Sequence, residues 1–239
     1  MKNLSKSPAV LLAKRCDELF HDDMKNNGDP FKNFYKSLPI CILDAVFSIG
    51  VRYKSVTNTV NSYIDTFCLP KTCEDESSDE HTINSFLDNI GKYETIEAFA
   101  KDALHNMQRT SSQNGILKAE ACRDVALVCK NHGINTLKDF REYADKKSLD
   151  CDIRAVKRQS SGIMLKYLYM LAGDESIVKP DRHVIRFIQE NSDSPVKSQE
   201  EIQLVMEQTT SILRNTYPKL TVRYLDNLIW DYQRHKKNS

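Results

Sequence analysis

Residues 158–188, RQSSGIMLKYLYMLAGDESIVKPDRHVIRFI, are the part of the chain from which the fold can be inferred. A turn of small and polar residues comes first, an apolar segment with helical spacing follows over 163–173, and an acid, Asp181, comes directly after a proline. Aspartate is a preferred first residue of helices, because its side chain accepts main-chain N–H groups there. Asp181 is therefore expected to begin a helix over the apolar-periodic residues that follow it.

A short basic segment precedes the turn. Residues 152–158 (DIRAVKR) have helical character, so two helices joined by a tight hairpin are expected over about 150–173. Between positions 151 and 170 the chain has four Lys or Arg residues and one acid, Asp152. Such a cluster can attract phosphates, and by itself it equally fits the solvated face of a helix.

The remainder of the 239-residue chain predicts an all-α protein. With 40% hydrophobic and 28% charged residues, the composition is that of an ordinary globular chain of one or two domains. The acidic segment 71–80 has five acids and no apolar period, so we expect an exposed loop there. About ten to twelve helices are expected, and the segments outside the hairpin with helical spacing or start signals are 8–20, 31–38, 39–50, 55–67, 82–91, 95–106, 116–133, 136–144, 200–216 and 221–234. The pairs Asp29–Pro30, Thr136 with Asp139 and Ser198 with Glu201 are expected to cap three of these helix starts.

Several classes of protein are excluded by composition and pattern. Too few consecutive uncharged apolar residues occur for a membrane span, and Lys14 and Arg15 interrupt the first apolar segment, which argues against a signal peptide. The seven cysteines are odd in number and include no CxxC pair. We therefore expect reduced, buried thiols in a cytoplasmic protein with no membrane partner. We also expect a monomer.

The order of elements around the hairpin resembles the helix-hairpin-helix (HhH-GPD) DNA glycosylase superfamily, which includes endonuclease III and the alkyladenine and 8-oxoguanine glycosylases. The resemblance is carried by residues 155–187, AVKRQSSGIMLKYLYMLAGDESIVKPDRHVIRF, in which KPDRHVIR is similar to the family's VDxHVxR signature. Upstream, ILDAVFSIGVRYKSV (42–56) looks like the family's first core helix and GILKAEACRDVALV (115–128) like the helix before the hairpin. The similarity covers roughly residues 38–190.

This resemblance implies a two-lobed helical fold with a helix-hairpin-helix motif. Residues 38–190 would form the core that carries the hairpin and the Asp181 helix. The terminal segments 1–37 and 191–239 would pack together as the other lobe. Because no cysteine follows Cys151, the four-cysteine iron–sulfur loop of some members is absent, and neither a cofactor nor a metal is expected.

The resemblance assigns Asp181 as the catalytic residue, although helix capping alone would also explain an aspartate at this position. The family's usual Pro-Gly-apolar-Gly hairpin reads KRQSSG here, so only Gly162 remains. The position of the catalytic lysine of bifunctional members falls on Ile163 or Met164, depending on the alignment, and is apolar in both cases. Lys166, about one helical turn further, is the alternative nucleophile.

The DNA contacts that the resemblance implies form two groups. Arg52 or Tyr53 is the candidate side chain that fills the gap left by a flipped base, and Gln108 and Arg109 could reach the opposite strand. Contacts to the DNA backbone are expected from the hairpin and from the start of the Asp181 helix, at Lys157, Arg158, Ser160, Ser161, Gly162, Lys166, Arg182 and His183.

The function expected from these residues is that of a monofunctional DNA glycosylase. Its partner would be double-stranded DNA that contains a damaged or modified base, and its product an abasic site, in DNA repair or in defence against modified phage DNA. Three alternatives stay open. They are a non-catalytic helix-hairpin-helix DNA-binding module, a bifunctional glycosylase/lyase that uses Lys166, and a helical protein-interaction domain with no nucleic-acid partner.

Overall fold

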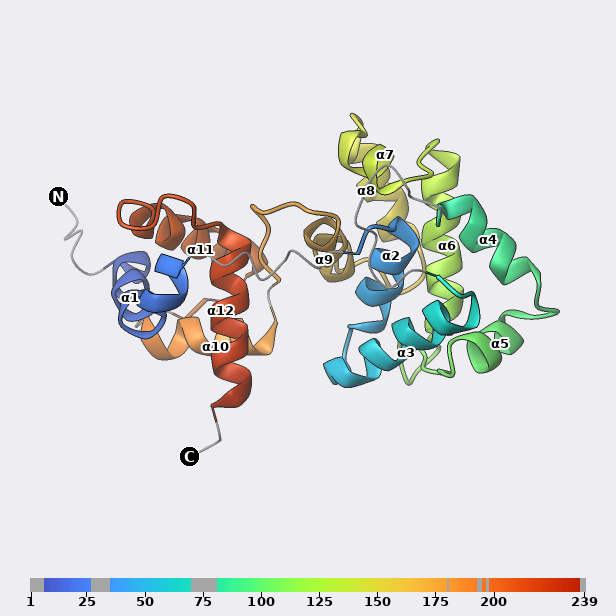
Figure 1. The fold of residues 1–239 in the computed structure, drawn as a ribbon, viewed down its shortest axis with the longest axis horizontal. Helices are drawn as coiled ribbons and strands as arrows, with labels where there is room; N and C mark the ends of the chain where they lie inside the picture. Colours follow the sequence, from blue (N-terminus) through green and yellow to red (C-terminus); the bar gives the residue numbers. More distant parts are fainter. Residues whose placement is uncertain are drawn as a thin grey trace. The chain divides into compact units, whose positions relative to one another are not determined.

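The computed structural model describes residues 7–26, 35–69, 81–179, 181–192, 195–196 and 198–236. The regular elements in these ranges are twelve α-helices and one π-helical turn, beside an isolated β-bridge between Arg109 and Leu117 (Figure 1). The predicted all-α class is confirmed. Among the helices described, none combines the length and the apolar character needed to cross a bilayer.

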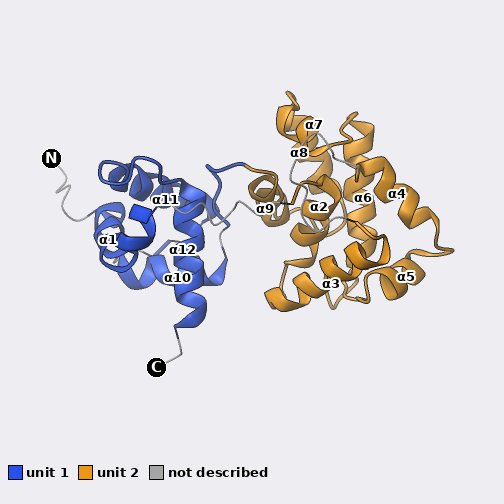
Figure 2. Ribbon diagram, viewed as in Figure 1, with its two compact units in different colours: residues 1–32, 174–239 blue, residues 33–173 orange. Residues whose placement is uncertain are grey.

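The chain forms two compact units, coloured separately in Figure 2. Unit 1 combines residues 1–32 with 174–239, and unit 2 comprises residues 33–173. The boundary follows Gly173, which has a φ of +109° directly after the last helix of unit 2. A left-handed φ of this kind favours glycine, because glycine has no Cβ to clash with the main chain.

Unit 2 is built around one completely buried helix, α2 (Leu38–Phe47). All ten residues of α2 are buried, and the helix packs against α3 (Tyr53–Thr66), α6 (Lys118–Asn131) and α9 (Ile163–Leu171). This explains why its sequence is nearly all apolar rather than amphipathic. The other helices of unit 2 are α4 (Ile83–Gly91), α5 (Ile96–Ala98), the π-helix Phe99–Ala103, α7 (Leu137–Glu142) and α8 (Lys146–Ala155).

Two local features of unit 2 test the sequence predictions. The expected pair at 136–139 forms a full capping box, in which the Thr136 side chain accepts the Asp139 N–H and the Asp139 side chain accepts the Thr136 N–H. The helix expected over 31–38 is not present as predicted, because residues 35–37 are non-helical and α2 begins at Leu38. Pro39 in the first turn suits that start. Residues 31–34, the pair Asp29–Pro30 and the acidic segment 71–80 lie outside the described residues.

The described residues of unit 1 form four helices and come from both ends of the chain. Its helices are α1 (Pro8–Asn26), α10 (Arg182–Asn191), α11 (Gln199–Leu213) and α12 (Val222–His235). Helix α1 packs mainly on α11 and α10 mainly on α12, and their apolar faces form one core around Leu12, Phe20, Met206 and Leu225. The predicted capping box of α11, Ser198 with Glu201, is present.

The structure places α10 differently from the expected division of the chain. We expected the Asp181 helix in the central segment 38–190, whereas α10 belongs to unit 1. The physical reason is its apolar face, because Val184, Phe187 and Ile188 are buried in the core shared with α1 and α12. The C-terminal segment of unit 1 therefore begins at residue 174 instead of 191, and α9 is the last helix of unit 2.

Candidate nucleic-acid interface

The turn between α8 and α9 is closed by its own main chain. The Gln159 N–H donates to the Val156 carbonyl (2.9 Å), and the Gly162 N–H donates to the Gln159 carbonyl (3.2 Å). Arg158 and Gly162 have left-handed φ values of +71° and +72°. The two helices and the tight turn expected over about 150–173 are thus present, with the Gly162 amide bonded inside the turn.

The outer surface of this turn is polar and basic. Lys157, Ser160 and Ser161 are exposed, and Lys166 is half-buried on the first turn of α9. The Ser161 hydroxyl accepts the Ile163 N–H at 3.5 Å. Hydroxyl and ammonium groups in such positions suit contacts to phosphate oxygens, which position a protein on DNA without reading its sequence.

A hydrogen bond joins the turn to the irregular segment 104–117. The Arg158 guanidinium donates from Nη2 to the Gln113 carbonyl (2.9 Å). Within that segment, the Arg109 side chain donates from Nε to the Gly115 carbonyl (2.9 Å), and the Thr110 N–H donates to the Ile116 carbonyl (2.9 Å). The segment is therefore a folded loop, and Arg158 holds the hairpin turn against it.

The two candidate insertion residues lie where the loop after α2 meets the start of α3. Gly50 is exposed with a φ of +71°, Arg52 is the exposed N-cap residue of α3, and the Tyr53 ring is 45% exposed. Gln108 connects this region to the folded loop, because its Nε2 donates to the Ser55 hydroxyl at 3.3 Å. The expected contact segments of unit 2 are thus linked to one another by hydrogen bonds.

A buried carboxylate lies at the base of the same loop. Asp44 on α2 is 1% exposed and accepts hydrogen bonds from the Tyr35 hydroxyl (2.8 Å) and the Ser48 hydroxyl (2.9 Å). Burial, together with the Asp44 charge, raises the pKa of Tyr35 above its usual range, so this hydroxyl stays a donor. The Ser48 bond connects Asp44 to the residue that follows α2, and the Tyr35 bond connects it to the segment that precedes α2.

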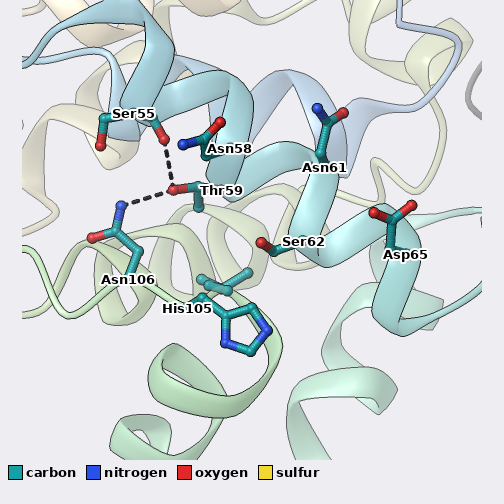
Figure 3. Close-up of a pocket in the computed structure, with 9 residues that line it drawn as sticks. Ser55, Asn58, Thr59, Asn61, Ser62, Asp65, His105 and Asn106 are labelled. Carbon is teal, nitrogen blue, oxygen red and sulfur yellow. Dashed lines mark hydrogen bonds between the residues drawn. The ribbon is translucent and has the colours of Figure 1, made fainter.

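A polar pocket of about 430 Å³ opens beside Ser55 (Figure 3). One wall is α3 and the other is the segment that follows the π-helix. The Asn106 amide donates to the Thr59 hydroxyl (2.7 Å), which in turn donates to the Ser55 carbonyl (3.0 Å). Amide and hydroxyl groups dominate the lining, with Asp65 and His105 as its titratable side chains.

Asp181 is the N-cap residue of α10, as predicted, and it belongs to unit 1. Its Oδ1 accepts the N–H groups of His183 (2.8 Å) and Val184 (3.1 Å), which is the geometry of a helix cap. The preceding turn is tight, because the Asp181 N–H donates to the Lys179 carbonyl at 2.7 Å. One carboxylate oxygen is therefore held rigidly by main-chain amides.

The two residues after Asp181 differ in accessibility. Arg182 is exposed, as a contact to the DNA backbone requires. The His183 ring is half-buried and makes an edge-on contact with the Trp230 ring, with centroids 6.3 Å apart. Its Nδ1 is buried and makes no hydrogen bond among the described residues. The environment of His183 is thus that of a packed ring rather than of an exposed phosphate ligand.

A second acid, Asp226 on α12, lies close enough to Asp181 for the two charges to interact. Asp226 is only 5% exposed, and its Oδ1 makes no hydrogen bond with any described residue. Burial, and then the Asp181 charge, raises the pKa of Asp226 well above its usual range. The neutral form of Asp226 is therefore favoured over its ordinary balance, and the Lys179 main-chain amide donates a hydrogen bond to it.

Sequence reasoning did not single out three residues of these regions. Lys118 is buried below the loops of unit 2, Met107 is 48% exposed beside Gln108, and Asp226 is buried beside Asp181. For Asp226 a signal did exist, because it lies between the core residues Val222 and Ile229 at helical spacing. For the other two, the deciding observation is the exposed fraction, low for Lys118 and high for Met107, which local sequence does not specify.

The site residues are divided between the two units. The hairpin and both loops belong to unit 2, whereas Asp181, Arg182, His183 and Asp226 belong to unit 1. The described residues include no group of three or more His, Cys, Asp or Glu side chains arranged to hold a metal ion.

Comparison with known proteins places the chain in one family. A search of the curated proteins and a search of the solved structures find no match. A family model, described as a domain of unknown function (DUF8548), matches residues 11–234 and therefore both units. The chain belongs to the DUF8548 family.

Proposed function

We propose that the protein is a DNA glycosylase that removes a damaged or modified base from double-stranded DNA and leaves an abasic site. The observation that carries the proposal is the arrangement at α10. There, one oxygen of Asp181 is bonded to two main-chain amides at a helix N-terminus. This holds the carboxylate in one orientation, as a group that must stabilise a developing positive charge requires.

The reaction would need little from the protein beyond position and charge. When the N-glycosidic bond breaks, the base leaves with the electron pair and positive charge develops on the sugar at C1′. Asp181 would stabilise that charge, and its carboxylate would accept a proton from the water that attacks C1′. The departing base is protonated by solvent, so the net reaction is hydrolysis.

Unit 2 supplies the features that favour a DNA partner. Its hairpin turn presents Lys157, Ser160 and Ser161, and the hydrogen bond between Arg158 and Gln113 keeps this turn beside the folded loop. An enzyme that acts on a base in a duplex must extrude that base and fill the gap. Exposed Arg52 and Tyr53 are suited to that task.

The proposed mechanism is monofunctional. The two positions that align with the lysine of lyase-active glycosylases are Ile163 and Met164, and neither side chain can form a Schiff base. Lys166 is half-buried on the same helix and remains the alternative nucleophile. A bifunctional enzyme would cut the strand and form a covalent adduct that borohydride traps.

The proposal is tested with duplexes that carry a panel of damaged and modified bases. Each is incubated with the wild type, with Asp181→Asn and with Asp145→Asn, and the products are treated with mild alkali to cut abasic sites. Asp145 is the matched control, since it is also an N-cap residue and accepts the Ser148 N–H at 3.1 Å. Single-turnover base release, borohydride trapping and thermal melting are measured for all three proteins.

We expect base release by the wild type and by Asp145→Asn, with no trapped adduct. Asn caps helices about as well as Asp, so both variants should melt within a few degrees of the wild type. Asp181→Asn should lose on the order of a hundredfold in rate, because the amide carries no charge and accepts no proton. Base release by Asp181→Asn at the wild-type rate would reject the mechanism. An adduct that Lys166→Ala abolishes would replace it with the bifunctional one.

A further inference from the structure

Lys118 is a buried lysine at the start of α6 in unit 2. It is 3% exposed, and its ammonium group has three oxygen partners, all of them uncharged: the carbonyls of Phe47 (3.0 Å) and Ile49 (2.8 Å) and Oε1 of Gln108 (3.5 Å). An ammonium group has three N–H donors, so this set matches its full capacity. Burial lowers the pKa of Lys118 to about 8, which leaves the amine mostly charged at neutral pH.

The two carbonyls belong to the end of α2 and to the loop after it. The last carbonyls of a helix have no partner within the helix and carry its partial negative charge, so a cation there is favourable. The ammonium also lies over the Phe47 ring, 5.8 Å from its centroid. Lys118 thus fastens the beginning of the loop that carries Arg52 and Tyr53.

The third partner belongs to the other loop. Gln108 is held at several points, because its carbonyl accepts the Lys118 N–H (2.8 Å) and its side-chain amide donates to the Ser55 hydroxyl (3.3 Å). With these bonds satisfied inside the protein, Gln108 acts as a joint between α3 and the folded loop. Its neighbour Met107 carries the exposed apolar side chain of this segment.

Burying a charge without a counter-charge is costly, and an apolar residue of similar volume usually gives equal or greater stability. A lysine at this position is therefore poorly explained by packing alone. Unlike an apolar residue, a lysine at this position can bind two loops at the same time. Each of these loops lies next to an exposed side chain, Tyr53 or Met107, that is suited to enter a DNA stack. Apolar side chains such as methionine commonly serve as wedges between base steps.

We infer that Lys118 is a positioning residue that fixes the α2–α3 loop and the folded loop 104–117 as one rigid edge for insertion into duplex DNA. The inference rests on the proposed function, because insertion matters only if a base is extruded. Lys118 itself touches no DNA. Its effect is to fix the positions of the Tyr53 and Met107 side chains before the duplex binds.

The test compares Lys118→Met with Lys130→Met, a matched control on the same helix whose lysine is exposed. Hydrogen–deuterium exchange of the DNA-free protein reports the rigidity of residues 48–53 and 104–117. Insertion is measured with a duplex that carries a tetrahydrofuran abasic-site analogue opposite 2-aminopurine, whose fluorescence rises when a side chain unstacks it. Affinity for undamaged duplex and the melting temperature complete the set.

In Lys118→Met we expect faster exchange in both loops together and loss of the 2-aminopurine signal, with base release lowered on the order of a hundredfold by misplacement. Affinity for undamaged duplex should stay within about twofold, since no phosphate contact is removed. If Lys118 only stabilised the fold, its replacement would instead lower the melting temperature and the DNA affinity together. The ratio of insertion to binding would then stay unchanged. That outcome, or unchanged exchange in either loop, would overturn the inference.

The two proposals can fail separately. If the wild type neither unstacks 2-aminopurine nor releases any base, the proposed glycosylase function fails, and the inferred insertion role fails with it. If the wild type does both and Lys118→Met does so equally well, the role of Lys118 alone is rejected.

Discussion

The guanidinium of Arg158 donates a hydrogen bond of 2.9 Å to the main-chain carbonyl of Gln113. This contact joins two segments that are 45 residues apart in the chain, the hairpin turn and the folded loop. The backbone of Arg158 has a φ of +71°, which is uncommon for residues other than glycine. Arg158 and its neighbour Lys157 are both exposed, but they differ because the Arg158 guanidinium holds the turn against the folded loop.

This difference predicts distinct effects of Lys157→Ala and Arg158→Ala on DNA binding. Lys157→Ala should weaken binding to all duplex sequences alike and reduce the slope of log Kd against log salt by about 1, as loss of one phosphate contact does. Arg158→Ala should in addition free the folded loop and reduce 2-aminopurine unstacking. Both variants are titrated with duplex at several salt concentrations. Unchanged affinity in the double variant would remove the hairpin from the interface.

Gly162→Ala is predicted to destabilise the protein. The residue has a φ of +72°, and a Cβ there would lie 2.6 Å from Nη2 of Arg154. We expect a loss of about 1–2 kcal/mol in the free energy of unfolding, since left-handed backbone alone costs a non-glycine residue about that much. Gly91→Ala is the control, because its Cβ would meet open space and its φ is not left-handed. Urea denaturation should show Gly91→Ala equal to or more stable than the wild type.

The buried His81 predicts a loss of stability in mild acid. His81 is 5% exposed, its Nε2 lies 3.0 Å from the Tyr63 hydroxyl, and burial lowers its pKa to about 4 from 6.5. Between these values the unfolded chain binds a proton that the folded chain excludes, so the free energy of unfolding falls as pH falls from 6.5 to 4. The loss attributable to His81 is on the order of 3 kcal/mol.

The measurement is urea denaturation at intervals between pH 7 and pH 4. His81→Gln should flatten this part of the profile, whatever its stability at pH 7. The exposed His105 provides the comparison, and His105→Gln should keep the wild-type slope. If His81→Gln retains the full loss of stability in acid, another group is responsible.

Asp226→Asn is predicted to stabilise the protein at neutral pH. Its raised pKa means that the folded chain keeps a proton that the unfolded chain releases above about pH 4, so its contribution to stability is present in acid and is lost as pH rises. The amide avoids this loss and can still accept the Lys179 N–H. Melting temperatures at pH 3 and pH 7 should therefore show a gain for Asp226→Asn at pH 7 only.

The control for this change is Asp231→Asn on the same helix. Asp231 is 55% exposed and forms an ion pair with Arg234 (3.0 Å), so its replacement should alter stability by less than about 1 kcal/mol at either pH. A lower melting temperature of Asp226→Asn at pH 7 would show instead that Asp226 is charged and paired in the folded protein.

What the sequence determined by itself is local. The helical spacing of apolar residues predicted most helices, and the capping residues Thr136, Asp181 and Ser198 marked three helix starts that the structure confirms. These features depend on residues three or four positions apart, whose contacts follow from the geometry of the helix alone. Gly162 is also predicted as a turn residue from its immediate neighbours, which are small and polar.

Tertiary structure decided the features that depend on burial and on contacts between distant segments. Helix α10 joined unit 1 because Phe187 packs in the core of α1 and α12, a preference that its own sequence cannot specify. The helical spacing around Asp226 indicates a buried position, but neither for Asp226 nor for Lys118 does local sequence give the shift in pKa. That shift follows from the packing that excludes water from the two side chains. The cost of taking a charge out of water depends on neighbours far away in the chain, so the fold sets it and local sequence does not.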